Sequence, residues 1–500
     1  MDPVHHYTGI ESPTSRSAFR ARLAEIDSEL DELAELHART SARIEQLETT
    51  RKPVASALDS IVYPILTLPV EMTSEIFAHY FNEVLSDVDG LPLCKLRTAR
   101  DGGPLILSQV CRAWRNIAIN THSMWCRVHA SAHNPGRPEW RNFLECWLSR
   151  AGNRMLYLDL IVDPCHFTKL FTTVVPYSAH WRVFKCCIGC DDNWTSISTL
   201  VDTVRGRTPL LHEFGVWWEG PSDFPTTAPI TAFSDAPELR KVTLHDLPSE
   251  KITLPWAQLT HLTLSGYNTT NVIAVLHLTE SLEELSIDLY GSASVGTQPV
   301  VLGRVHRLVL PNSFGYVTQT LSCVTLPKLR SLEIGQIFMA EHADALLTFA
   351  KRSHCTLETI SVPGDAEQHL TMYTLESKAI RTASHVSVPD IDWSVYELEQ
   401  FFSWIASDSA FLPNMRSLHL PRCTTEVPFA ALADMLSSRS YNRAGQSRLE
   451  SFRLIQTYRQ GPDHAIAPAM AEQLRDLMDD GLDIHIESIN GMGYTEKFSR

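Results

Sequence analysis

Three stretches of the sequence share one pattern: Leu239-Arg-Lys-Val-Thr-Leu244, Leu259-Thr-His-Leu-Thr-Leu264 and Leu282-Glu-Glu-Leu-Ser-Ile287. In each stretch, apolar residues stand at the first, fourth and sixth positions. Alternate residues of a strand point to the same face, so the second and third apolar side chains share one buried face. This repeat pattern starts at Met155, Trp181, Leu211, Leu239, Leu259, Leu282, Val305, Leu329, Leu357, Ala383, Met415 and Leu449.

Successive starts are 20 residues apart at Leu239 and Leu259 and 34 apart at Met415 and Leu449. The pattern resembles the leucine-rich repeat, whose short strands stack into the parallel sheet of a solenoid. The resemblance implies that helical stretches such as 343–350 and 429–436 line the convex face. The Asn or Cys that the family favours eight positions after each start is present only as Cys423. The alternative is a non-repeat α/β domain with several Leu-x-Leu strands, but twelve occurrences in order favour the solenoid.

The N-terminal region predicts a long helix with a heptad pattern. The apolar seam residues are Phe19, Leu23, Ile26, Leu30, Leu33, Ile44 and Leu47, with polar His37 and Thr40 at the two remaining seam positions. We expect residues 1–16 to be disordered and the coiled-coil helix to cover 17–52. Pro53 should end it, because proline lacks the N–H that bonds one turn back. Two interpretations stay open: the helix pairs with a second copy or a partner, or it folds back on its own domain.

Residues 53–130 carry two further helical patterns. In Pro64-Ile-Leu-Thr-Leu-Pro-Val-Glu71, Pro69 and Glu71 suit the first turn of a helix. The apolar stripe of that helix comprises Met72, Ile76, Phe77 and Tyr80. A second helix is predicted over 105–118, with Val110, Trp114, Ile117 and Ala118 on one face. The stretch 82–104 between them is rich in Asp, Gly and Pro, which predicts a surface insertion.

These two helices resemble the F-box. That family's pattern is Leu-Pro-x-Glu, then Ile-Phe, then Val-Cys-x-x-Trp and a downstream Trp. This sequence supplies Leu68, Pro69, Glu71, Ile76, Phe77, Val110, Cys111, Trp114 and Trp125. The insertion at 82–104 is longer than the family's usual connection. With the preceding heptads, the Tyr63–Pro69 run is similar to F-box proteins of mushroom-forming fungi. The alternative is a small helical bundle in which Trp114 and Trp125 are core residues.

The resemblance implies a non-catalytic, substrate-recruiting subunit of a Skp–cullin–RING-type ubiquitin ligase. The residues expected to bind the Skp-type adaptor, or to shape that contact, are Leu68, Pro69, Ile76, Phe77, Val110, Cys111 and Trp114. Residues 131–154 would form a linker with a capping helix, and 155–490 the solenoid. An unknown protein substrate would bind the concave face, where Trp217, Lys241, His245, His261, Arg307, His385 and His419 point outward. Two alternatives stay open: a repeat scaffold without a ubiquitin ligase, and an enzyme whose site no motif reveals.

Composition narrows the class of protein further. The net charge of -15 and the pI of about 5.8 argue against a nucleic-acid partner, which attracts basic surfaces. The sequence shows no secretory signal and no apolar run of about 20 residues that could cross a membrane, so we expect a cytoplasmic or nuclear protein. The eleven cysteines are expected as free thiols. The cluster at Cys186, Cys187 and Cys190 lacks the second pair that a zinc site needs, so no metal, cofactor or catalytic residue is predicted.

Overall fold

The computed structural model describes residues 13–59, 64–86, 104–129, 138–160, 167–188, 194–220, 229–289, 298–311, 316–335, 341–364, 368–441, 446–458, 468–490 and 495–498. Of the segment expected to be disordered, 1–16, residues 13–16 belong to a helix and 1–12 lie outside these ranges. Of the expected insertion, 82–104, both ends are helical, at 82–86 and at 104, and 87–103 lies outside these ranges. The chain falls into two units, Met1–Ile76 and Phe77–Arg500. Each unit has its own architecture and is described by itself.

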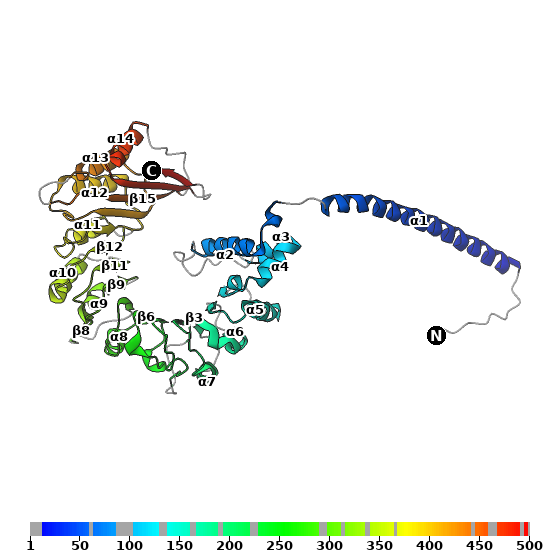
Figure 1. The fold of residues 1–500 in the computed structure, drawn as a ribbon, viewed down its shortest axis with the longest axis horizontal. Coiled ribbons are helices and arrows are strands. Elements are labelled where there is room, and N and C mark those ends of the chain that lie inside the picture. The colour runs from blue at the N-terminus through cyan, green and yellow to red at the C-terminus, as the bar shows by residue number, and fades with distance from the viewer. Residues whose placement is uncertain are drawn as a thin grey trace. The chain divides into compact units, whose positions relative to one another are not determined.

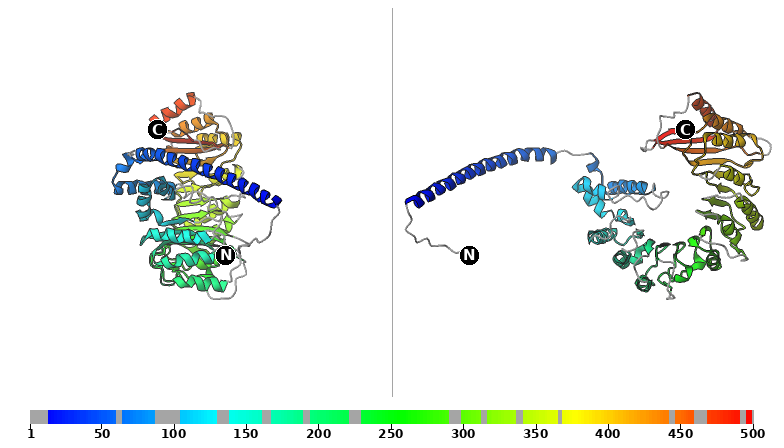
Figure 2. Two further views of the ribbon diagram at one scale, coloured as in Figure 1. Left: turned by 90° about the vertical axis from the view of Figure 1, so that its right-hand side faces the viewer. Right: turned by 180° about the vertical axis from the view of Figure 1, so that it is seen from behind.

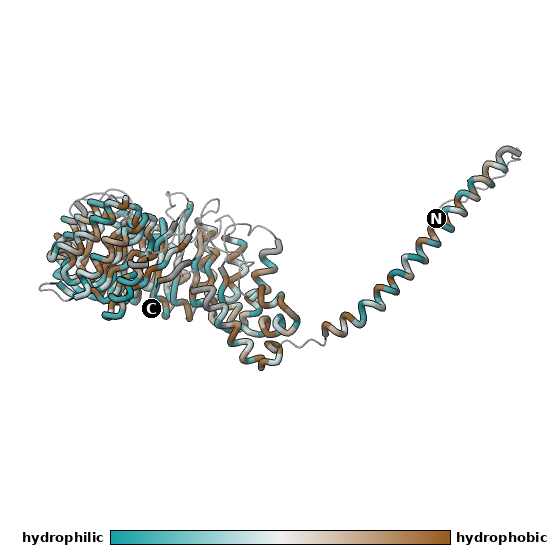
Figure 3. Tube along the Cα trace, turned by 90° about the horizontal axis from the view of Figure 1, so that it is seen from above, coloured by the Kyte–Doolittle hydropathy of each residue, from teal (hydrophilic) through white to brown (hydrophobic). Residues whose placement is uncertain are grey.

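The first unit is dominated by α1 (Pro13–Asp59), which is followed by η1 (Pro64–Thr67) and the start of α2 (Val70–Ser86). The prediction that Pro53 ends the long helix is wrong, because α1 passes through this residue. One proline costs a helix interior about 3 kcal/mol, and the heptad register continues beyond it at Val54 and Leu58. Apolar segments recur among polar ones along the length of α1 (Figure 3).

The second unit begins with the remainder of α2, followed by α3 (Pro104–Val110), α4 (Arg112–Asn120) and η2 (His122–Trp125). The single helix predicted over 105–118 is two helices, separated at Cys111. The backbone of Cys111 is extended, with φ -156° and ψ 173°, and its thiol accepts a hydrogen bond from the N–H of Trp114. Cys111 therefore caps the start of α4, and Val110 no longer shares a helical face with Trp114.

Most of the second unit is one sheet of fifteen strands, in which all pairs but the last are parallel. Its strands, in spatial order, are β1 (Arg127–His129), β2 (Leu156–Leu160), β3 (Trp181–Ile188), β4 (Glu213–Trp218), β5 (Lys241–His245), β6 (His261–Tyr267), β7 (Glu284–Leu289), β9 (Arg307–Leu310), β11 (Ser331–Ile334), β12 (Thr359–Ser361), β13 (His385–Ser387), β14 (Ser417–Cys423), β15 (Ser451–Tyr458), β16 (Asp483–Asn490) and antiparallel β17 (Thr495–Phe498). Two short strands, β8 (Val300–Val301) and β10 (Val324–Thr325), form a separate pair.

Each of the twelve predicted repeats supplies one strand of this sheet. Every residue of the repeat pattern is buried, with the single exception of the exposed Met155. In register, Val242 lies beside Leu262 and Leu262 beside Leu285, so the apolar residues of successive repeats form continuous rows. The predicted α/β solenoid with a parallel sheet is confirmed.

The repeat pattern did not predict the two strands at the ends of the parallel array, β1 and β16. The register of β16 against β15 aligns Gly481 with Leu449, so a glycine stands where the pattern requires an apolar side chain. The register of β1 against β2 aligns Trp125 with Met155, so Trp125 takes the first position of the repeat pattern. The third position of this repeat is Ala130 in the sequence, and the small side chain of alanine gives only a weak apolar signal. The tryptophan that carried part of the F-box resemblance is therefore also the first core residue of the solenoid.

Helices cover the convex side of the sheet, and strands line its inner side (Figures 1 and 2). They are α5 (Pro138–Ala151), α6 (Phe167–Val174), α7 (Trp194–Val201), α8 (Thr269–Leu276), α9 (Val317–Cys323), α10 (Glu341–Ser353), α11 (Gln368–Leu375), α12 (Val395–Ser407), α13 (Phe429–Arg439) and α14 (Pro468–Asp479), with short turns η4 (Val175–His180), η5 (Asp202–Val204), η6 (Ser249–Lys251) and η7 (Trp256–Gln258). The expected capping helix, α5, packs between η2 and α6. The ring of its Trp147 lies 4.8 Å from that of Trp125.

Candidate functional site

Three of the predicted adaptor-binding residues contribute to the fold of their own helices. Phe77 is only 2% exposed, and its ring packs edge-to-face on Trp114 with 5.0 Å between ring centroids. Such an aromatic pair stabilises a small helical domain by about 1 kcal/mol beyond the area that it buries. Cys111 caps α4 as described above. Phe77 is therefore a core residue, and the half-buried Cys111 and Trp114 help to shape this region.

The other predicted adaptor-binding residues are exposed. Ile76 on α2 is 46% exposed, Val110 at the end of α3 is 58% exposed, and Leu68 and Pro69 before α2 are exposed as well. Further apolar side chains near them in sequence are exposed too: Ile65, Leu66, Val70 and Met72 in the first unit, and Tyr80 and Ile106 in the second. Exposed apolar side chains in such number are typical of protein-interaction surfaces. Of the apolar stripe predicted for this helix, Phe77 is buried, whereas Met72 and Tyr80 are exposed.

The concave face carries a ladder of opposite charges along neighbouring strands. At one end, Lys185 Nζ lies 2.7 Å from a carboxylate oxygen of Glu213. Further along, Glu284 lies 3.5 Å from the imidazole of His261 and 3.9 Å from the guanidinium of Arg307. The ladder ends at Glu333, whose carboxylate accepts a hydrogen bond of 3.1 Å from Arg307. A shallow hollow of about 190 Å³ lies over its middle, between Glu213 and Glu284.

Burial governs the protonation of several groups on this face. It lowers the pKa of His261, with nearby Lys241 acting in the same direction, and it lowers the pKa of His419, helped by Arg453. It also raises the pKa of Asp288, whose Oδ2 accepts a hydrogen bond of 3.0 Å from the Ser265 hydroxyl. The lowered pKa of His261 favours its neutral form near pH 7, so the charged members of the ladder are Lys185, Glu213, Glu284, Arg307 and Glu333.

The structure divides the seven predicted substrate-binding residues into two groups. Trp217 lies beside His245 in register, and Lys241 lies beside His261, so these four share the region of β4 to β6. Arg307 joins them through the carboxylate of Glu284. His385 and His419 belong to β13 and β14 and lie apart from that group. Sequence reasoning missed Lys185 and Glu213, although opposite charges at outward positions of adjacent repeats would have signalled the pair.

No family model matches the chain, and no curated protein matches it. Among solved structures, it is similar to the leucine-rich-repeat-containing protein LegL7 from Legionella pneumophila, at 12% identity over 63% of this chain and 92% of that one, with a TM-score of 0.33. A Bacteroides fragilis protein matches at 10% identity over 58% of this chain and 74% of that one, with a TM-score of 0.29. TLR13 in its complex with ssRNA13 matches at 12% identity over 63% and 38%, with a TM-score of 0.25.

Scores this low carry no argument about function. The assignment of the fold follows from the register of the strands and from the buried rows of the repeat pattern. The fold is a leucine-rich-repeat solenoid. Such solenoids present a continuous surface built from many repeats, which suits the binding of protein partners.

The described part of the solenoid and of the helices before it contains no group of three His, Cys, Asp or Glu side chains arranged to hold a metal. Its eight described cysteines are free thiols. Burial raises the pKa of the Cys186 thiol far above its usual range, which suits a core residue and not a nucleophile. Cys190, the third member of the predicted cluster, lies outside the described residues. No described helix combines the length and the apolar character that a membrane crossing requires.

Proposed function

We propose that the chain is the substrate-recruiting F-box subunit of a Skp–cullin–RING-type ubiquitin ligase. The observation that carries this proposal is the ordered motif Leu68-Pro69-x-Glu71, Ile76-Phe77 and Val110-Cys111-x-x-Trp114, placed directly before a leucine-rich-repeat solenoid. The roles of its residues support the proposal. Phe77, Cys111 and Trp114 hold the helices, while Ile76 and Val110 remain exposed for a partner.

In this role the chain carries out no covalent step. Exposed apolar residues around α2 and α3 bind the Skp-type adaptor, because apolar anchors supply most of the energy of such an interface. The concave face, with Trp217, Lys241, His245, His261 and Arg307, binds the protein substrate. The ligase then gains rate by proximity, since a substrate lysine is held near the ubiquitin-charged enzyme. Such a ligase operates in the cytoplasm or the nucleus, which agrees with the localisation expected from the sequence.

The adaptor contact is tested with substitutions at exposed positions, because replacing Trp114 would also remove the partner of Phe77. Wild-type protein and the variants Ile76→Glu and Val110→Glu are each mixed with a purified Skp-type adaptor, and binding is measured by titration calorimetry. We expect binding by the wild type and an affinity at least about tenfold lower in each variant, since a buried carboxylate opposite an apolar partner is desolvated. The matched control is Leu278→Glu, at a comparably exposed leucine of the solenoid.

The control variant should bind the adaptor like the wild type, and circular dichroism should show all four proteins equally folded. If the wild type does not bind the adaptor, the F-box proposal is wrong. The chain is then a leucine-rich-repeat scaffold that binds partners without a ubiquitin ligase.

We also propose that α1 mediates self-association. The seam residues Leu23, Leu30, Ile44 and Leu47 are all exposed on this 47-residue helix. In a parallel, in-register pair, Arg22 of one copy faces Asp27 of the other, and Arg43 faces Glu48, since residues flanking the seam five positions apart meet across the interface. The polar seam residues His37 and Thr40 also meet their own counterparts in this arrangement.

A further inference from the structure

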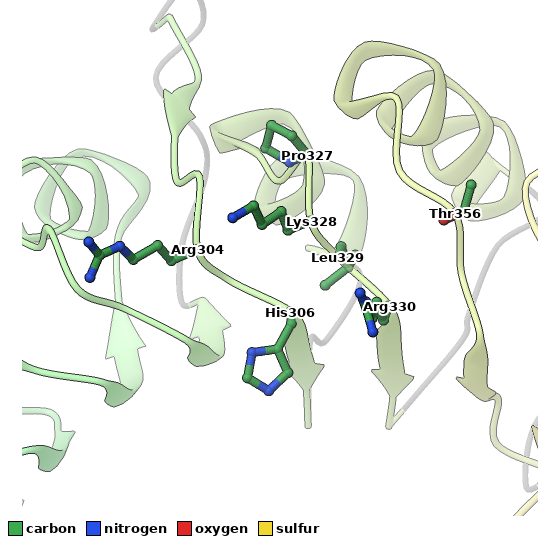
Figure 4. A pocket seen from close by; sticks show the side chains of 7 residues that line it. All are labelled: Arg304, His306, Pro327, Lys328, Leu329, Arg330 and Thr356. Atoms are coloured by element: carbon green, nitrogen blue, oxygen red, sulfur yellow. The ribbon is translucent and has the colours of Figure 1, made fainter.

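A hollow of about 480 Å³ with a basic lining lies at the amino ends of β9, β11 and β12 (Figure 4). Its lining consists of Arg304, His306, Pro327, Lys328, Leu329, Arg330 and Thr356. In Figure 4, Lys328 extends toward the segment that carries Arg304, while His306 and Arg330 stand at the starts of neighbouring strands. The Arg304 side chain extends to the other side of its own segment, away from Lys328, and four nitrogen-bearing side chains line the hollow.

The repeat geometry produces this cluster. Arg304 and His306 flank the buried Val305, and in the next repeat Lys328 and Arg330 flank the buried Leu329, so all four basic side chains are exposed. The N–H of Arg330 donates to the carbonyl of His306 at 2.9 Å, which fixes the two repeats side by side. Each basic residue of one repeat therefore has a basic counterpart at the equivalent position of the next.

The positive charge of the cluster is poorly compensated. Within the described residues, no carboxylate forms an ion pair with Arg304, His306 or Lys328, and Arg330 has one exposed contact of 3.7 Å with Glu358. The positions equivalent to His306 and Arg330 in the flanking repeats are Glu283 and Glu358. The basic area is therefore limited to two repeats and bounded by acids, in a chain whose net charge is -15.

This confinement identifies the kind of ligand. A nucleic acid needs a run of cations that follows many phosphates, and here glutamates interrupt the run on both sides. Carboxylates match the planar, two-pronged donors of arginine, and a lysine adds a mobile point charge. Lys328 and Arg330 flank the same buried leucine, so two acidic side chains of one peptide could approach the hollow with one carboxylate near each of these cations.

We infer that this hollow binds a short acidic segment of a protein partner through at least two Asp or Glu carboxylates. The inference goes beyond the proposed function, because it requires neither the adaptor nor transfer of ubiquitin. It adds a second contact region to the solenoid, at the amino ends of the strands and distinct from the charge ladder of the concave face.

Fluorescence anisotropy of the full chain with a labelled Gly-Asp-Glu-Asp-Glu-Gly peptide tests the inference. We expect saturable binding that weakens as salt rises, because exposed charges are screened. In the double variant Arg304→Glu, Lys328→Glu the affinity should fall at least about tenfold. The matched control, Lys169→Glu, Lys351→Glu, changes the net charge equally at exposed lysines of α6 and α10 and should stay within about twofold of the wild type.

Equal losses of affinity in the two double variants would show a general effect of net charge and would overturn the assignment. Binding of a singly phosphorylated serine peptide but not of the Asp/Glu peptide would overturn the assignment to carboxylates. Adaptor binding, measured on the same variants, should remain unchanged. A failure of this inference can therefore be distinguished from a failure of the F-box proposal.

Discussion

Two arginines on the convex side show how single residues join neighbouring repeats. Arg439, in the last turn of α13, is only 1% exposed and donates to the carbonyls of Ile405 at 2.8 Å and Phe411 at 2.7 Å. Arg352, in the last turn of α10, donates in the same way to the carbonyls of Leu321 at 2.5 Å and Val324 at 2.7 Å. In both cases the guanidinium satisfies carbonyls around the end of the preceding helix, where cations are favourable.

Replacing Arg439 by Met should lower the free energy of unfolding by about 3 kcal/mol or more, because buried carbonyls lose their charged donor. The measurement is urea unfolding followed by tryptophan fluorescence. The control is Arg141→Met, whose exposed i,i+4 pair with Glu145 is worth at most about 0.5 kcal/mol. Similar losses in the two variants would show that the buried guanidinium has no special role.

Among the elements, α1 differs from the helices of the solenoid because the apolar side chains of its seam are exposed along the described helix. The heptad runs from Phe19 to Leu47 and continues at Val54 and Leu58 beyond Pro53. An isolated helix in water is only marginally stable, and helices in proteins gain most of their stability from packing of an apolar face. A second copy of α1 would supply that packing, and its flanking charges match in the parallel orientation.

The substitutions Ile26→Glu and Leu33→Glu together should convert a dimer of the full chain into a monomer at micromolar concentration. Each leucine-sized side chain removed from the seam forfeits about 1.5–3 kcal/mol of burial, and the new carboxylates repel each other across the interface. Sedimentation velocity measures the change. Ser28→Glu with Ala42→Glu adds the same charge on the outer face of the helix and should leave the dimer intact. A wild-type chain that is monomeric at 100-fold higher concentration would contradict self-association.

At the scale of the whole molecule, the solenoid has one continuous core but only local neighbours. Each strand pairs with the adjacent ones, from β1 to β16, and antiparallel β17 covers the last edge. Stability in such an array is approximately a sum of terms within repeats and between adjacent repeats. A substitution in one repeat should therefore affect nearby repeats much more than distant ones.

Phe452→Ala in β15 tests this locality. The side chain is fully buried, so its removal should cost about 3–5 kcal/mol. Native-state hydrogen exchange should show a loss of protection in β14, β15 and β16 and little change in β2 to β4. The reciprocal variant Phe184→Ala in β3 should show the opposite distribution. A uniform loss of protection along the sheet would mean that the solenoid unfolds as a single cooperative unit.

The positions of the strands were predictable because each repeat needs apolar residues at fixed spacing to fill a narrow core. That local requirement located the twelve repeats, while helical stretches between them located the helices at 343–350 and 429–436, and a heptad pattern located the seam of α1. The sequence also predicted some of the charged residues of the concave face, such as Lys241 and Arg307, because outward positions alternate with buried ones along each strand. The end strands β1 and β16 were not predicted, because Ala130 and Gly481 stand at pattern positions and their small side chains supply little of the apolar signal.

Other features depended on contacts between segments that sequence spacing does not encode. Cys111 ends α3 because its extended backbone caps α4, and this exposes Val110 while Trp114 packs on Phe77. The basic hollow exists because the register places Lys328 and Arg330 beside Arg304 and His306 in the adjacent repeat. The sequence by itself determined the repeat and its buried rows, since each repeat must place apolar side chains at the same short spacing to fill its part of the core. Only the tertiary structure decided which charges meet and which apolar residues stay exposed, since both depend on stacking between repeats.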